Sequence, residues 1–170
     1  MTDDHSAPRL EEQLCFAIYA AEHAFSAAYR PLLDPLGLTY PQYLVLMQLW
    51  AEDGRSVGKL GDGLHLDSGT LTPLLKRMEA AGLVTRRRDP KDERVVLIHL
   101  TPKGDLMRAQ GRDVRDAIGR AIALPPEELA VLRTTLTMLA ARLRNGRAFR
   151  CCAPPPPGPP APSGTPSAAS

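Results

Sequence analysis

The sequence of 170 residues has few cysteines, few aromatic residues and no long apolar run. Its three cysteines are odd in number and too few for the disulfide framework of a small secreted protein. No run of 18 apolar residues occurs, which argues against a membrane-spanning helix. The start, Met1–Ser6, is polar and acidic and does not resemble a secretory signal. We therefore expect a cytoplasmic protein with reduced thiols and no membrane partner.

Metal and nucleotide motifs are also missing. The four histidines His5, His23, His65 and His99 are scattered without the spacing of metal ligands. No glycine-rich loop of the kind that binds nucleotide phosphates is present. The sequence therefore predicts neither a metal site nor a cofactor.

Basic residues are concentrated in one part of the chain. The segment 76–94 contains seven basic and four acidic residues, an excess larger than the net charge of +2 for the whole chain. A second basic group comprises Arg142, Arg144, Arg147 and Arg150. Such clusters are compatible with an anionic partner.

Proline marks the end of the folded part. Eight of the 17 prolines lie in the last twenty residues, among small and polar residues that offer little apolar surface to bury. We interpret 149–170 as a disordered tail, 1–9 as an N-terminal arm and 10–148 as the folded domain.

Apolar spacing predicts a mainly helical domain with one hairpin. The last helix, opened by Pro125 and Pro126, has leucines at 129, 132, 136, 139 and 143, spaced as in a coiled-coil seam. The glycines at 58, 61 and 63 make the third helix a poor one. The expected helices are 10–33, 42–52, 57–64, 68–81 and 102–122, and the expected strands are 83–88 and 94–100.

Three helices followed directly by a hairpin is the order of a winged helix-turn-helix, in which the second helix of the turn lies in the DNA major groove. Short polar side chains open helix 68–81, arginines fill the hairpin, and Asp92 is close enough to orient Arg94 for a narrow minor groove. The alternative is a solvated basic hairpin on an unrelated helical domain. The candidate DNA-binding residues are Asp67, Ser68, Thr70, Thr72, Lys76, Arg77, Arg86, Arg88, Asp92 and Arg94.

The stretch Leu66-Asp67-Ser68-Gly69-Thr70-Leu71-Thr72-Pro73, with Gly82-Leu83-Val84 and Asp92-Glu93-Arg94-Val95, strongly resembles the MarR family of winged-helix repressors. With Cys15 in Gln13-Leu14-Cys15-Phe16-Ala17, it is similar to the branch of organic hydroperoxide resistance regulators. The resemblance implies a homodimer on a pseudo-palindromic DNA operator. Residues 10–36 and 102–148 would form the dimerisation helices, and 41–100 the DNA-binding part.

A lone cysteine such as Cys15 is usually a buried structural thiol. Tyr19 follows it at i+4 on the same helix face. Tyr29 lies fourteen residues on, about 21 Å along a straight helix, and could reach only a partner's Cys15. The resemblance implies that two tyrosines of the other subunit, matched by Tyr29 and Tyr40, hydrogen-bond a reactive cysteine. They could equally be ordinary interface aromatics.

The resemblance implies a repressor that leaves its operator when an organic hydroperoxide oxidises Cys15. Some members of the branch carry a resolving cysteine in the long helix before the last one, but 114–124 contains none. A small thiol or the Cys151–Cys152 pair would then reverse the oxidation. Two alternatives stay open: a MarR-type repressor relieved by a non-covalent lipophilic ligand, and a thiol peroxidase, for which the basic hairpin would have no purpose.

Overall fold

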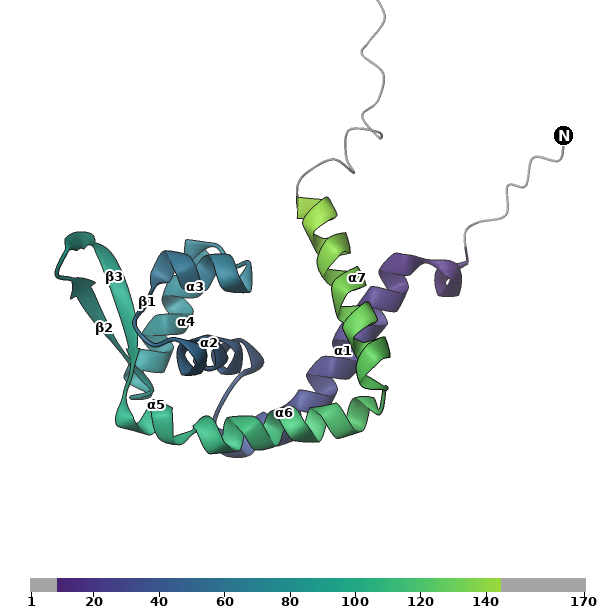
Figure 1. The fold of residues 1–170 in the computed structure, drawn as a ribbon, viewed down its shortest axis with the longest axis horizontal. Coiled ribbons are helices and arrows are strands. Elements are labelled where there is room, and N and C mark those ends of the chain that lie inside the picture. The colour runs from purple at the N-terminus through teal and green to yellow at the C-terminus, as the bar shows by residue number, and fades with distance from the viewer. Residues whose placement is uncertain (1–8, 145–170) are drawn as a thin grey trace, which may run out of the picture. The chain divides into compact units, whose positions relative to one another are not determined.

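The structure is a computed structural model that describes residues 9–144 (Figure 1). The predicted tail 149–170 and all of the predicted arm 1–9 except Arg9 lie outside these residues. The described residues divide into two units, with the boundary between Ala123 and Leu124. The first unit contains a short 3₁₀ turn η1 (Leu10–Glu12), helices α1 to α6 and a small sheet. In the second unit, the described residues form helix α7 (Pro126–Arg144).

Helix α1 (Leu14–Leu33) begins later than the sequence predicts. The apolar spacing indicated one helix over 10–33, but Gln13 is extended (φ −87°, ψ 127°) and separates η1 from α1. A helix that began at residue 10 would place Cys15 in its second turn, whereas Cys15 is the second residue of α1 and lies in the first turn. This correction places the thiol closer to the positive end of the helix dipole.

Helix α2 (Tyr40–Ala51) follows the second 3₁₀ turn η2 (Asp34–Leu36) and Gly37, which has a positive φ of 65°. The Thr39 N–H donates to the Gln42 side chain at 2.8 Å. This hydrogen bond satisfies a backbone donor at the helix start that has no partner within the helix. Tyr43, Val45, Leu46 and Leu49 are buried, as expected for a helix that is apolar nearly all round.

The helix-turn-helix consists of α3 (Val57–Leu64) and α4 (Ser68–Ala80). Two of the three glycines that make α3 a weak helix in isolation, Gly61 and Gly63, have a packing reason. A Cβ at Gly61 would lie 2.8 Å from the Leu66 carbonyl oxygen, and Gly63 lies against the Gln48 side chain. Leu60, Leu71, Leu74, Leu75 and Met78 are buried, so burial stabilises both helices.

The sheet has one more strand than the sequence predicts. β1 (Arg55–Ser56), β2 (Val84–Asp89) and β3 (Asp92–Leu100) form an antiparallel sheet in the order β1-β3-β2. β2 and β3 form the predicted hairpin, with a loop of only two residues, Pro90 and Lys91, and an irregularity at Arg88/Asp89. β3 begins two residues before the predicted strand 94–100, so Arg94 is its third residue and not its first.

The long helix expected over 102–122 is two helices, α5 (Pro102–Leu106) and α6 (Arg108–Ile122), that meet at Met107. Gly104 on α5 and Gly111 on α6 both touch neighbours from other elements, because a Cβ at Gly104 would meet the Leu83 carbonyl and one at Gly111 would meet the Trp50 ring. The chain bends between these two close approaches.

Candidate functional site

The N-terminus of α4 is capped by Asp67. Its carboxylate accepts from the Thr70 N–H at 2.8 Å and from the Thr70 hydroxyl at 3.1 Å. The Thr70 N–H is the main cause that lowers the pKa of Asp67 below its ordinary value, followed by the Thr70 hydroxyl. Asp67 therefore fixes the start of the helix, and its predicted contact with DNA stays a prediction.

One face of α4 is exposed to solvent and does not pack against the rest of the described chain. Leu71, Leu74, Leu75 and Met78 point into the core. Ser68, Thr70, Lys76 and Arg77 are exposed and Thr72 is half-buried. Small hydroxyls near the helix start and two cations further along therefore face solvent together, as the sequence predicts for a helix that contacts DNA.

The tip of the hairpin presents a fixed guanidinium. The Arg94 side chain is 91% exposed, yet its Nε and Nη2 donate to the two Asp92 carboxylate oxygens at 3.0 and 3.1 Å. The Arg94 N–H also donates to Asp92 at 3.1 Å. The hydrogen bonds from the Arg94 side chain are the first cause that lowers the pKa of Asp92. The two side chains therefore make the contact that the sequence predicts, and the role of Arg94 on DNA stays a prediction.

A hollow of about 390 Å³ lies between the start of α3, Thr72 of α4 and the hairpin. Arg86 and Arg94 line it, and the Arg86 Nε is buried without a hydrogen-bond partner in the described part of the chain. Arg88 lies further along β2, where its side chain donates to the Glu93 carbonyl at 2.9 Å. The hollow is therefore suited to an anionic group.

The thiol and the two tyrosines are separate within one chain. Cys15 is exposed in the first turn of α1, and the exposed Tyr19 ring packs edge-on to His23 with ring centres 4.2 Å apart. Because α1 is one continuous helix, Tyr29 is about 21 Å further along its axis. A single chain therefore does not bring Cys15 to Tyr29.

Tyr29 and Tyr40 do lie together, with ring centres 4.6 Å apart. Burial, followed by the neighbouring Tyr40 and Tyr43, raises the pKa of Tyr29 to about 12, and burial also raises the pKa of Tyr40. Both hydroxyls are thus protonated donors at neutral pH. A pocket of about 210 Å³ opens between the two rings and Ser26.

Sequence reasoning missed Tyr43, which anchors this pair. Its ring centre is 6.0 Å from that of Tyr29, and its buried hydroxyl donates to the Gly111 carbonyl at 2.9 Å. The signal was available, since Tyr43 follows Tyr40 by one helical turn.

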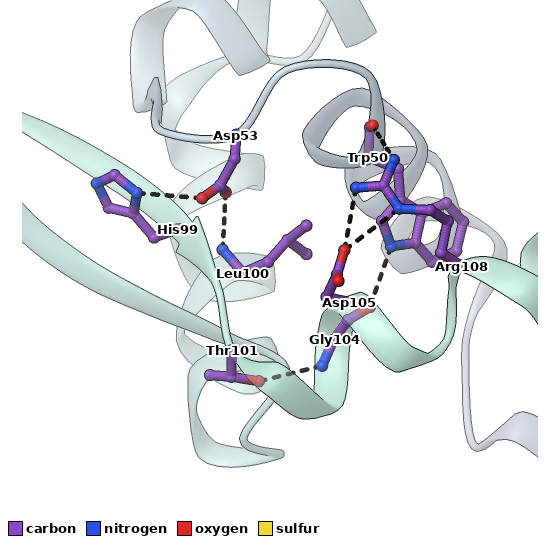
Figure 2. A network of polar contacts seen from close by, with 8 residues as sticks. All are labelled: Trp50, Asp53, His99, Leu100, Thr101, Gly104, Asp105 and Arg108. Atoms are coloured by element: carbon purple, nitrogen blue, oxygen red, sulfur yellow. Dashed lines mark hydrogen bonds and ion pairs between the residues drawn. The ribbon is translucent and has the colours of Figure 1, made fainter.

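A polar junction at the end of α2 was also missed (Figure 2). The Trp50 indole N–H donates to the Gly104 carbonyl at 3.0 Å, and Arg108 donates to the Trp50 carbonyl and to Asp105. Beside it, the Asp53 carboxylate accepts from the Leu100 N–H at 2.8 Å and contacts the His99 Nδ1 at 3.3 Å. This junction joins α2 to the root of the hairpin and to α5 and α6.

Within residues 9–144, no group of three or more His, Cys, Asp or Glu side chains could hold a metal ion. No helix in this part of the chain is long and apolar enough to cross a membrane.

The helix-turn-helix, the arginine-bearing hairpin and the free face of α4 define a winged-helix DNA-binding protein. The profile of the family described as "Transcriptional regulator SarA/Rot" matches residues 27–108. The organic hydroperoxide resistance transcriptional regulator of Bacillus subtilis is 47% identical over 137 residues, which cover 81% of this chain and 93% of the relative.

Solved structures agree with the sequence relatives. Reduced AbfR of Staphylococcus epidermidis bound to DNA is 38% identical, with a TM-score of 0.66 over 79% of this chain and 94% of that one. Disulfide-formed AbfR is 39% identical, with a TM-score of 0.58 over 78% and 93%. The chain belongs to the MarR family of winged-helix transcriptional regulators and is of the type to which the hydroperoxide resistance regulators belong.

Proposed function

We propose that the protein is a peroxide-sensing repressor. A homodimer binds a pseudo-palindromic operator when reduced and leaves it when an organic hydroperoxide oxidises Cys15. The observation that carries the proposal is the split arrangement of the site. An exposed thiol lies at one end of α1, and Tyr29, about 21 Å further along that helix, lies with Tyr40 beside a pocket.

A second copy of the chain completes this site. When two α1 helices cross antiparallel, Cys15 of one subunit lies beside the partner's Tyr29. Exposed apolar side chains on α1, such as Leu14 and Phe25, and on α7, such as Leu132 and Leu136, support burial of both helices in a dimer. The similarity to a named hydroperoxide resistance regulator supports the same arrangement.

On DNA, the free face of α4 enters the major groove and Arg94 reaches the neighbouring minor groove. The hollow lined by Arg86 takes a backbone phosphate, which supplies a partner for the Arg86 Nε. The two copies of α4 must match half-sites about 34 to 36 Å apart, so a change in their separation weakens both half-sites.

The chemical step is a transfer of one oxygen atom. The Cys15 thiolate attacks the outer peroxide oxygen, an S–O bond forms and the O–O bond breaks, and the departing alkoxide takes a proton to become an alcohol. The products are a sulfenic acid and the alcohol. The hydroxyls of Tyr29 and Tyr40 donate to the reacting oxygens. Reduction then uses a small thiol or Cys151 and Cys152, which lie outside the described residues.

The decisive test is a titration of the protein with DNA from its own upstream region. We expect tight binding by the reduced wild type and release after addition of cumene hydroperoxide. Cys15→Ser should bind as tightly and stay bound. Release of Cys15→Ser by the peroxide would show that another group senses it. Catalytic peroxide turnover in the presence of a reductant would indicate a thiol peroxidase instead.

One observation favours a second candidate, relief of repression by a non-covalent lipophilic ligand. An apolar hollow of about 180 Å³ lies between α1 and α6, lined by Phe25, Ala28 and Ile118 among others. Release of both wild type and Cys15→Ser by the alcohol product alone would support this candidate.

A further inference from the structure

Helix α1 carries a seam with a charged residue at its centre. Cys15, Ile18, Glu22, Phe25 and Tyr29 are spaced 3, 4, 3 and 4 residues apart, so they follow one face of the helix. Four of these side chains are a thiol, an aliphatic group and two aromatic rings. Glu22 is the only carboxylate in α1.

The seam is exposed from Cys15 to Phe25, and only Tyr29 at its end is half-buried against the core of its own chain. Ile18 and Phe25 are 39% and 45% exposed, and the Glu22 side chain is 64% exposed. The adjoining stripe with Ala24 and Ala28 lines the apolar hollow against Ile118 and Ile122 of α6, and Phe25 lies at the border between this stripe and the seam. The face with Glu22 is therefore the one that remains for a partner.

Glu22 already has both carboxylate oxygens in use. One lies 3.1 Å from the His23 Nδ1, and the other accepts from the Ser26 hydroxyl at 2.8 Å. A second helix can close over this cluster while both carboxylate oxygens keep a contact within their own chain.

The register follows from symmetry. In an antiparallel pair that sets Cys15 against the partner's Tyr29, the two-fold axis passes the residue midway between them, residue 22. We infer that Glu22, held by His23 and Ser26, forms a polar node at the crossing point of two α1 helices and fixes their register. Glu22 is thus a positioning residue for the thiol site. A single polar residue in an apolar seam is known to select one register over its neighbours.

This inference rests on the proposed peroxide-sensing dimer, and cross-linking separates the two. In a full-length chain with Cys15, Cys151 and Cys152 replaced by serine, Glu22→Cys should give an oxidised covalent dimer, because facing Cα atoms at the axis come within the reach of a disulfide. Ser26→Cys is the register control, since its two copies would be about 12 Å apart along the axis. Ala20→Cys is the face control, because residue 20 points to the opposite side of the helix.

A parallel arm tests the dimer itself. With only the tail cysteines replaced, Tyr29→Cys should cross-link to the partner's Cys15. If this pair forms and Glu22→Cys does not cross-link, the node is wrong while the proposed site stands. If neither pair forms, the antiparallel arrangement fails and the inference fails with it.

The functional arm compares Glu22→Leu with Glu22→Gln. Both should remain dimers by mass and bind the operator when reduced. The rate of Cys15 oxidation by cumene hydroperoxide should fall about tenfold or more in the leucine variant, because the thiol is misplaced relative to the tyrosines. The glutamine variant, which keeps the hydrogen bonds, should stay close to wild type. Wild-type oxidation in Glu22→Leu would overturn the positioning role.

Discussion

The indole N–H of Trp50 donates to the carbonyl oxygen of Gly104 at 3.0 Å and so joins the last turn of α2 to α5 (Figure 2). Trp50→Phe keeps a ring in place but leaves this half-buried carbonyl without its donor. We expect unfolding in urea to become easier by about 1 to 2 kcal/mol with an unchanged m-value. Unchanged stability would mean that water replaces the indole at no cost.

Replacing each of two glycines of α6 by alanine should change the free energy of unfolding in opposite directions. A Cβ at Gly111 meets the Trp50 ring, whereas at Gly119 nothing lies within 4 Å. Gly111→Ala should destabilise the fold by about 1 to 3 kcal/mol through overpacking. Gly119→Ala, the matched control, should stabilise it by up to about 1 kcal/mol through helix propensity. Denaturant unfolding of both variants measures the difference.

The Asp67 cap predicts a loss of stability in acid. Its pKa is lower in the folded chain than in the unfolded one, so its contribution is present above the ordinary carboxyl pKa and is lost as the pH falls through the folded value. Asp67→Ala should lower the urea midpoint at pH 7 and flatten this acid dependence. Asp67→Asn keeps a capping oxygen and should retain most of the stability at pH 7. Equal midpoints for wild type and Asp67→Ala at pH 7 would contradict the capping role.

The ion pair at the hairpin tip gives a test in which charge and geometry oppose each other. Asp92→Asn removes a negative charge, so electrostatics alone would tighten DNA binding. If Asp92 serves to hold Arg94 in place, affinity falls instead, and Arg94→Lys lowers it by about tenfold. Fluorescence anisotropy with operator DNA at several salt concentrations measures the affinity and so distinguishes the electrostatic gain from the loss of Arg94 orientation. Lys91→Ala at the loop is the control.

The tyrosine pair should act on sensing and not on DNA binding. Tyr29→Phe and Tyr40→Phe each remove one hydroxyl donor, and the rate of Cys15 oxidation should fall about tenfold, the value of one hydrogen bond to a charged group. Affinity of the reduced protein for the operator should not change. Oxidation of both variants at the wild-type rate would leave the tyrosines as interface aromatics.

Because the pKa of Tyr29 is raised to about 12, the stability that this shift contributes is present below pH 10 and is lost as the pH rises towards 12.

The sequence predicts this fold well where local patterns decide it. Helix α3 has its predicted bounds despite three glycines, and the hairpin lies where alternating apolar residues indicate it. The failures depend on contacts between distant residues. β1 is two residues long and exists only by pairing with β3, and the bend at Met107 lies between two glycines packed against Trp50 and Leu83.

The candidate site shows the same division. The Asp92–Arg94 pair is local and could be predicted from the sequence. The anchoring of Tyr43 to Gly111 spans 68 residues, and the Asp53–Leu100 contact spans 47, so neither has a signal in the nearby sequence.

Helix α2 links two regions as well as forming part of the core. Tyr40 is at its first turn and Trp50 is about 15 Å away at its last. Between them, the buried side chains of Val45, Leu46 and Leu49 hold the helix in the core. One buried helix therefore carries a tyrosine of the proposed sensing pocket at its first turn and the indole that holds the root of the hairpin at its last.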